Sequence, residues 1–197
     1  KRVDRAQLYA VDDLLRRYGD PAFRKTAQRK FTVFEGQGVK RRIQRRKLWQ
    51  RLYRLEVLRP PFREYLKKQD EFLYRELSQE AYEDAWREFA GSSPDRESEY
   101  EQLLTYYLFC SLCGAVYDGD LYSRVKLAVV HTMLIQELDL GAWLTGGKEF
   151  SFEDQVELVH RYARETEHSD LNMEAMECMA AEDEAFVLEP LLTGILG

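Results

Sequence analysis

This 197-residue sequence has few residues that cross-link a chain or interrupt its helices: 3 cysteines, 5 prolines and 11 glycines. An odd number of cysteines in a chain of this size argues against a disulfide framework and favours a reducing compartment. The N-terminus has no signal-peptide pattern, and no uninterrupted apolar run approaches the roughly 20 residues that a membrane-spanning helix needs. We therefore expect a cytoplasmic protein that does not cross a membrane.

Charge is abundant but unevenly distributed along the chain. The net charge of -6 combines a basic N-terminal part with an acidic remainder. Residues 1–68 hold 21 of the 29 Lys and Arg residues but 7 of the 35 Asp and Glu residues. The chain also opens on Lys1 instead of Met, which leads us to expect a fragment of a longer protein.

Apolar residues recur with helical spacing along the whole chain, and no segment shows the alternation of a strand. We predict helices over residues 3–18, 21–34, 39–58, 62–77, 79–90, 100–117, 121–140, 151–167 and 173–181. The short connection Asp118-Gly119-Asp120 predicts that 100–117 and 121–140 pack as a central antiparallel hairpin. The expected fold is all-α: a helical bundle with a basic N-terminal helical arm. We divide it at the linker 91–95 into a basic region, 1–96, and an acidic bundle, 97–197.

The strongest electrostatic feature is a basic run on the predicted helix 39–58. It consists of Lys40, Arg41, Arg42, Arg45, Arg46 and Lys47. Such a run is typical of a surface that binds an acidic protein partner. An equally simple interpretation is that it is solvated or lies against the protein's own acidic surface. Nucleic acid is disfavoured as a partner because the sequence pI is about 5.3.

Two patterns have the spacing of metal ligands. Cys110 and Cys113 form a C-x-x-C pair, but no second pair exists to complete a zinc site. Residues 157–160 and 165–168 each read Glu-x-x-His on one helix, and the two copies lie about 12 Å apart along its axis. That separation is too large for one metal cluster, so we interpret these residues as a solvated or partner-facing stripe and predict no metal site.

Asp118 and Asp120 flank a glycine in a tight connection, where carboxylates suit a cation or general-base chemistry. Helix capping explains both residues without any such function. The sequence contains no Gly-rich phosphate loop and no nucleophile elbow.

Several strings in the second half resemble the C-terminal helical part of the flagellin lysine-N-methylase family. They are YYLF at 106–109, AVYDGD at 115–120, VKLAV at 125–129, ELDL at 137–140, FEDQVE at 152–157 and YARETEHSD at 162–170. The resemblance implies a bacterial cytoplasmic enzyme that transfers methyl groups from S-adenosylmethionine to lysine side chains of flagellin. It also implies an N-terminal cysteine-rich segment holding a metal or iron–sulfur cluster.

This chain has no cysteine before Cys110, so it departs from the family pattern in that part. We expect the chain alone to be inactive and to help bind flagellin or complete the active site. Candidate site residues inside the matching strings are Tyr117, Asp118, Asp120, Glu165 and His168. The alternative hypothesis is a non-catalytic interaction module that uses the basic run, and the oligomeric state stays open.

Overall fold

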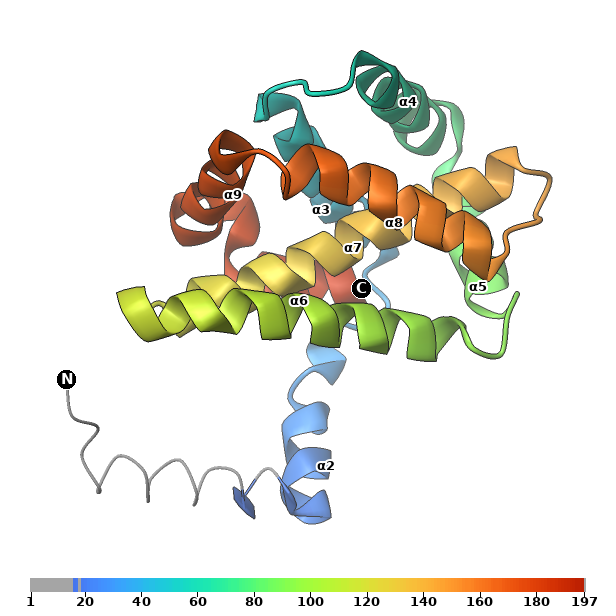
Figure 1. Cartoon of the computed structure of the whole chain (residues 1–197). Coiled ribbons are helices and arrows are strands. Elements are labelled where there is room, and N and C mark those ends of the chain that lie inside the picture. The colour runs from blue at the N-terminus through green and yellow to red at the C-terminus, as the bar shows by residue number, and fades with distance from the viewer. Residues whose placement is uncertain (1–15, 18, 197) are drawn as a thin grey trace.

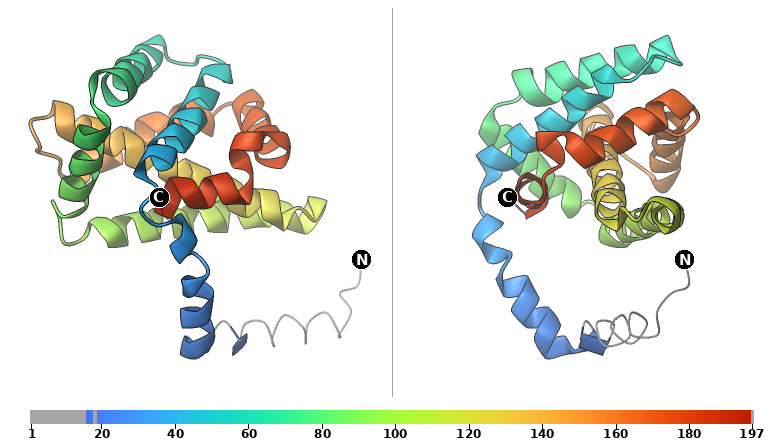
Figure 2. Two further views of the ribbon diagram at one scale, coloured as in Figure 1. Left: turned by 180° about the vertical axis from the view of Figure 1, so that it is seen from behind. Right: turned by 90° about the vertical axis from the view of Figure 1, so that its left-hand side faces the viewer.

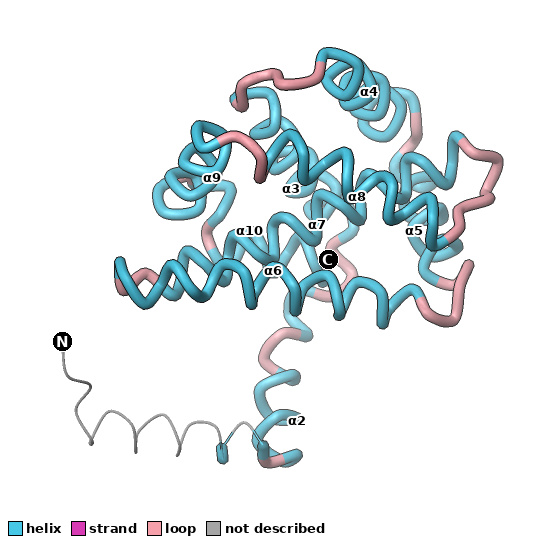
Figure 3. The backbone as a smooth tube through the Cα atoms, in the orientation of Figure 1, coloured by secondary structure: helices cyan, strands magenta, loops and turns pink. Residues whose placement is uncertain are grey.

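The computed structural model describes residues 16, 17 and 19–196, and the predicted helix at 3–18 lies largely outside them. The all-α prediction is confirmed, because the described residues form helices and contain no strand (Figure 3). The α-helices are α2 (Pro21–Arg29), α3 (Gly38–Arg51), α4 (Pro60–Glu71), α5 (Gln79–Ala90), α6 (Arg96–Asp118), α7 (Leu121–Thr145), α8 (Phe152–Thr166), α9 (Asp170–Glu182) and α10 (Leu188–Leu196).

Side-chain caps begin four of the helices. The Ser78 hydroxyl accepts a hydrogen bond from the Ala81 amide at 3.0 Å. Asp120, Ser151 and Ser169 cap α7, α8 and α9 in the same way. Each cap satisfies an amide that the first helical turn leaves without an intrahelical partner. The starts of these helices are therefore local properties of the sequence.

Helix ends depend more on context than the sequence indicates. α2 stops at Arg29 instead of about residue 34, and residues Thr32–Phe34 form a separate 3₁₀ turn. α3 stops at Arg51 and tightens into a 3₁₀ turn, after which Leu55 is extended. The Leu55 carbonyl then accepts a hydrogen bond from Arg63 Nη2 at 2.7 Å, a tertiary contact that the periodicity does not encode.

α7 is the central helix of the fold, and it contacts α3, α5, α6, α8, α9 and α10 (Figure 1). It is the one described helix that is long and apolar enough to cross a membrane, and 78% of its apolar window is buried by the rest of the protein. Core packing therefore accounts for its composition. α6 precedes it through Gly119, whose φ of 78° is the left-handed conformation that glycine adopts without strain.

α6 packs along α7, and one of its faces stays open. Phe109 is 75% exposed, and Tyr106 is 52% exposed. Cys110 and Cys113 are free and also exposed.

The predicted basic and acidic regions share one hydrophobic core. Leu48 and Trp49 of α3 belong to the same buried cluster as Leu138 of α7. Arg51 also forms a two-pronged ion pair with Asp183, with donor–acceptor distances of 2.7 and 3.0 Å. α2, by contrast, projects away from the bundle in every view (Figure 2). The division at residues 96 and 97 stays a prediction.

A buried charge network joins α3, α7 and α10. The Glu137 side chain of α7 is 1% exposed. Its carboxylate accepts hydrogen bonds from the hydroxyls of Tyr74 and Tyr82, both at 2.7 Å, and from Arg45 Nη1 at 3.1 Å. Arg45 is 3% exposed and also donates through Nε to the Gly194 carbonyl at 2.7 Å. Both charges are thus removed from water but provided with partners, as buried charges require.

We predict that Glu137→Gln lowers the free energy of unfolding by about 3–5 kcal/mol, because it leaves Arg45 buried without an anionic partner. Urea denaturation followed by circular dichroism measures the change. The exposed Glu149→Gln is the matched control, and the double variant Arg45→Met/Glu137→Leu is expected to recover part of the loss. A loss in Glu137→Gln as small as that of the control would contradict the prediction.

Candidate functional site

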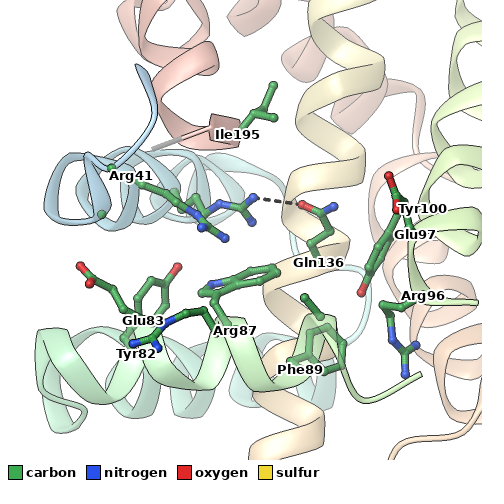
Figure 4. Close-up of a pocket in the computed structure, with 15 residues that line it drawn as sticks. Arg41, Tyr82, Glu83, Arg87, Phe89, Arg96, Glu97, Tyr100, Gln136 and Ile195 are labelled. Carbon is green, nitrogen blue, oxygen red and sulfur yellow. Dashed lines mark hydrogen bonds between the residues drawn. The ribbon is translucent and has the colours of Figure 1, made fainter. Parts of the chain in front are cut away.

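A pocket of about 560 Å³ opens beside this network, between α3, α5, α6, α7 and α10 (Figure 4). Its walls combine aromatic rings, guanidinium groups and carboxylates. The lining residues are Gly36, Gly38, Arg41, Arg45, Tyr82, Glu83, Trp86, Arg87, Phe89, Ala90, Arg96, Glu97, Tyr100, Gln136 and Ile195. The volume lies within the range of small-molecule and side-chain binding pockets.

The arginines of the basic run stack on the aromatic rings of α5. The guanidinium carbons of Arg41 and Arg45 lie 4.7 and 4.5 Å from the centre of the Trp86 ring, and that of Arg42 lies 4.8 Å from the centre of the Tyr82 ring. Figure 4 shows Arg41 reaching from α3 toward this wall. Such cation–π contacts stabilise partly desolvated arginines.

The interpretation of residues 40–47 as an exposed basic surface needs correction for Arg42, Arg45 and Arg46. Arg45 is buried, and Arg42 Nη2 donates to the carbonyls of Leu73 and Leu77 at 2.6 and 2.9 Å. Arg46 is half-buried, with its Nε 3.7 Å from the Asp70 carboxylate. Lys40 and Lys47 are exposed. Partner binding by the remaining charges stays a prediction.

The charges of the pocket are mostly matched in pairs. Arg45 pairs with Glu137, and Arg96 pairs with Glu99 at 2.8 Å. Arg87 pairs with Asp84. Burial and the neighbouring Arg45 lower the pKa of Arg41 to about 10. Three of the four arginines that line the pocket therefore have a carboxylate partner.

Two carboxylates that line the pocket, Glu83 and Glu97, form no ion pair with any described residue. Glu83 accepts a hydrogen bond from Gln79 at 2.6 Å and packs against Gly38, where a Cβ atom would overlap its carboxylate. Glu97 is exposed at the other side of the pocket. These groups favour a cationic ligand.

Tyr100 connects the pocket wall to a second buried carboxyl group. Its hydroxyl donates to Asp139 Oδ2 at 2.7 Å, and Gln155 Nε2 donates to the same oxygen at 2.8 Å. Asp139 is 0% exposed, and its Oδ1 has no hydrogen-bond partner among the described residues. Burial raises the pKa of Asp139 to about 7, against the opposing effect of its two donors and of Arg96. This carboxyl group can therefore gain and lose a proton near neutral pH.

The site residues predicted from the resemblance lie elsewhere. Tyr117 is 92% exposed, and Asp120 caps α7 through the Ser123 amide at 3.0 Å. The side chain of Asp118 lies outside the described residues. His168 is exposed beyond the end of α8. No catalytic role of these residues is tested by their positions, and they do not line the pocket.

Glu165 has a structural position that the sequence did not predict. It is 8% exposed instead of solvated, and its Oε2 accepts a hydrogen bond from the Leu58 amide at 3.1 Å. Glu157 and His160 of the other Glu-x-x-His copy are exposed. Within the described part of the chain, no group of three His, Cys, Asp or Glu side chains is placed to hold a metal ion.

Sequence reasoning missed Glu137, Asp139 and Tyr100. A signal was available, since Glu137 and Asp139 are the two acidic residues inside the segment 121–140, which is rich in apolar residues. Acidic side chains are almost never fully buried without partners. Their position in a helix predicted to form the central hairpin was therefore a reason to expect a polar network.

We predict that the free energy of unfolding of the wild-type protein has a component, due to Asp139, that falls as pH rises from about 4 to about 7. The sign follows because the folded-state pKa is raised, so the folded protein holds a proton that the unfolded chain has released. The expected slope is at most about 1.4 kcal/mol per pH unit. Asp139→Asn removes it, whereas Glu101→Gln on an exposed face of α6 retains it. Urea titrations at several pH values measure the slopes, and identical pH dependence in Asp139→Asn and wild type would refute this assignment.

Comparison of the sequence with known protein families gives a match. The model of the FliB lysine N-methylase C-terminal domain family matches residues 1–194 of the chain. No curated protein and no solved structure matches it. The family match spans nearly the whole sequence and confirms the resemblance of the strings between residues 106 and 170. The chain therefore belongs to the FliB lysine N-methylase family, in which it represents the C-terminal domain.

Proposed function

We propose that this chain is the C-terminal domain of a bacterial enzyme that methylates lysine side chains of flagellin in the cytoplasm, with S-adenosylmethionine as methyl donor. The family match over residues 1–194 is the observation that carries the proposal. Cys110, Cys113 and Cys178 are free, which agrees with a reducing compartment.

Methylation of lysine requires a neutral amine, whereas a lysine side chain in water has a pKa of about 10.4 and is protonated. The enzyme must therefore bind an ammonium group, lower its pKa and accept its proton. Glu83 and Glu97 attract the ammonium group into the pocket. Desolvation by the aromatic walls and the nearby guanidinium of Arg41 then favour the neutral amine.

Tyr100 and Asp139 supply a route for the proton. The ammonium group gives a proton to the Tyr100 oxygen while the Tyr100 hydroxyl passes its own proton to Asp139 Oδ2, 2.7 Å away. The products of this step are a neutral amine, a neutral tyrosine and a protonated Asp139. The pKa of about 7 suits Asp139 to this exchange near neutral pH. Tyr100 is the group that touches the substrate, and Asp139 acts through it.

The pocket is a poor match for the methyl donor itself. The rings that could stack on an adenine, those of Trp86, Tyr82 and Phe89, are already covered by guanidinium groups at 4.5 to 4.8 Å. We therefore assign the substrate lysine to this pocket and derive no step through donor-binding residues of this chain. S-adenosylmethionine supplies the methyl group when it is bound by the complete enzyme.

Calorimetry with S-adenosylmethionine tests this division of roles. We expect heat of binding from the complete enzyme that contains this domain, and none from residues 1–197 alone. Binding by residues 1–197 alone would place the donor site in this domain. Failure of the complete enzyme to bind would refute the methylase proposal.

The pH dependence of flagellin methylation tests the proton route. In the complete enzyme we expect the rate to fall as pH drops below about 7, because Asp139 must be ionised to accept the proton. Asp139→Asn and Tyr100→Phe are each expected to lower the rate by about 10²-fold or more. Glu101→Gln is the control. Incorporation of labelled methyl groups measures the rates, and a wild-type pH profile in Asp139→Asn would exclude this route.

A further inference from the structure

A second concave surface lies between the start of α4 and the middle of α8, away from the pocket of Figure 4. It encloses about 400 Å³. Its lining residues are Leu58, Arg59, Pro60, Pro61, Phe62, Glu157, Arg161 and Arg164. We call this surface the arginine groove. It combines three cations, one anion and an apolar wall, although the chain as a whole is acidic.

The three arginines of the groove have no carboxylate partner among the described residues. Arg59 and Arg164 form neither an ion pair nor a side-chain hydrogen bond there. The guanidinium carbon of Arg161 lies 5.0 Å from the centre of the Tyr65 ring and 5.7 Å from that of Phe62. Stacking holds this guanidinium in place, and its N–H groups form no hydrogen bond with a described residue. Arg42 and Arg45 of α3, by contrast, donate hydrogen bonds to acceptors inside the protein.

The backbone on both sides of the groove is held in place. Arg59 precedes Pro60 and is extended, with φ of −132°, as a residue before proline prefers. The amide of the preceding Leu58 is fixed to α8 by Glu165 Oε2 at 3.1 Å. Arg161 and Arg164 are three residues apart on α8, so their side chains lie on one face. The backbone of the groove is thus preorganised, which lowers the part of the entropic cost of binding that comes from ordering the main chain.

We infer that the arginine groove binds an acidic peptide segment of a partner protein. Unmatched guanidinium groups recognise carboxylates by paired hydrogen bonds, so charge complementarity identifies the occupant as acidic. The apolar wall of Leu58, Pro60 and Pro61 provides space for an apolar side chain between the acidic ones, which a peptide carries and a simple anion lacks. The inference concerns docking alone and does not depend on the methylation reaction.

Binding of a fluorescein-labelled peptide with four glutamates around one leucine tests the inference by fluorescence anisotropy, with the whole chain as receptor. We expect Arg161→Gln/Arg164→Gln to weaken binding at least tenfold and Arg59→Gln to weaken it several-fold. The side chain of Arg59 is exposed and forms no ion pair or hydrogen bond with a described residue, so its variant keeps the test valid if the double variant is unstable. Increasing salt is expected to weaken wild-type binding.

The matched control is Arg24→Gln/Lys25→Gln, which removes two exposed charges of α2 without touching the groove. Peptide affinity is expected to stay at the wild-type value in this variant. Equal losses in the control and groove variants, no binding by wild type, or equal binding of the corresponding glutamine peptide would each overturn the inference. Tighter binding of a thymidine oligonucleotide of the same charge, lost in Arg161→Gln/Arg164→Gln, would overturn it in favour of nucleic acid.

Discussion

The burial of Glu137 constrains most of this structure. A carboxylate that is 1% exposed must be surrounded by donors, and Arg45, Tyr74 and Tyr82 supply them from three segments of the chain. Since an unpaired buried charge costs several kcal/mol, α7 reaches its central position only when the segments carrying these residues are in place. Arg45 extends the constraint to the C-terminal helix through the carbonyl of Gly194. The interpretation in which the basic run lies against the protein's own acidic residues thus holds for Arg45, whose partner is Glu137.

The same principle separates structural charges from charges that are available to a ligand. On α3 the guanidinium groups lie on aromatic rings and bind internal acceptors, so their charge is largely used within the fold. In the pocket, Glu83 and Glu97 form no ion pair with a described residue. In the arginine groove, the same holds for Arg59 and Arg164. The two concave surfaces therefore favour ligands of opposite charge.

Much of the fold was predictable because it depends on local interactions. The caps at Ser78, Ser151 and Ser169 and the glycine turn at 119 are encoded within a few residues. The end of α3 is not, because the Leu55 carbonyl after the helix is bound by Arg63. The candidate site residues were chosen from strings that resemble the family, whereas the pocket joins residues from five helices.

The sequence by itself determined the all-α class, most helix starts and the family, because periodicity, capping residues and characteristic strings are properties of short segments. Only the tertiary structure decided which charges are buried, matched or exposed. The residues that fix the environment of Arg45 lie 92 and 149 positions away along the chain. Arg59, which precedes α4, and Arg161 of α8 likewise line one groove. Because the energy of a charge depends on the groups around it in space, its role follows from the packing and cannot be predicted from neighbouring residues in the sequence.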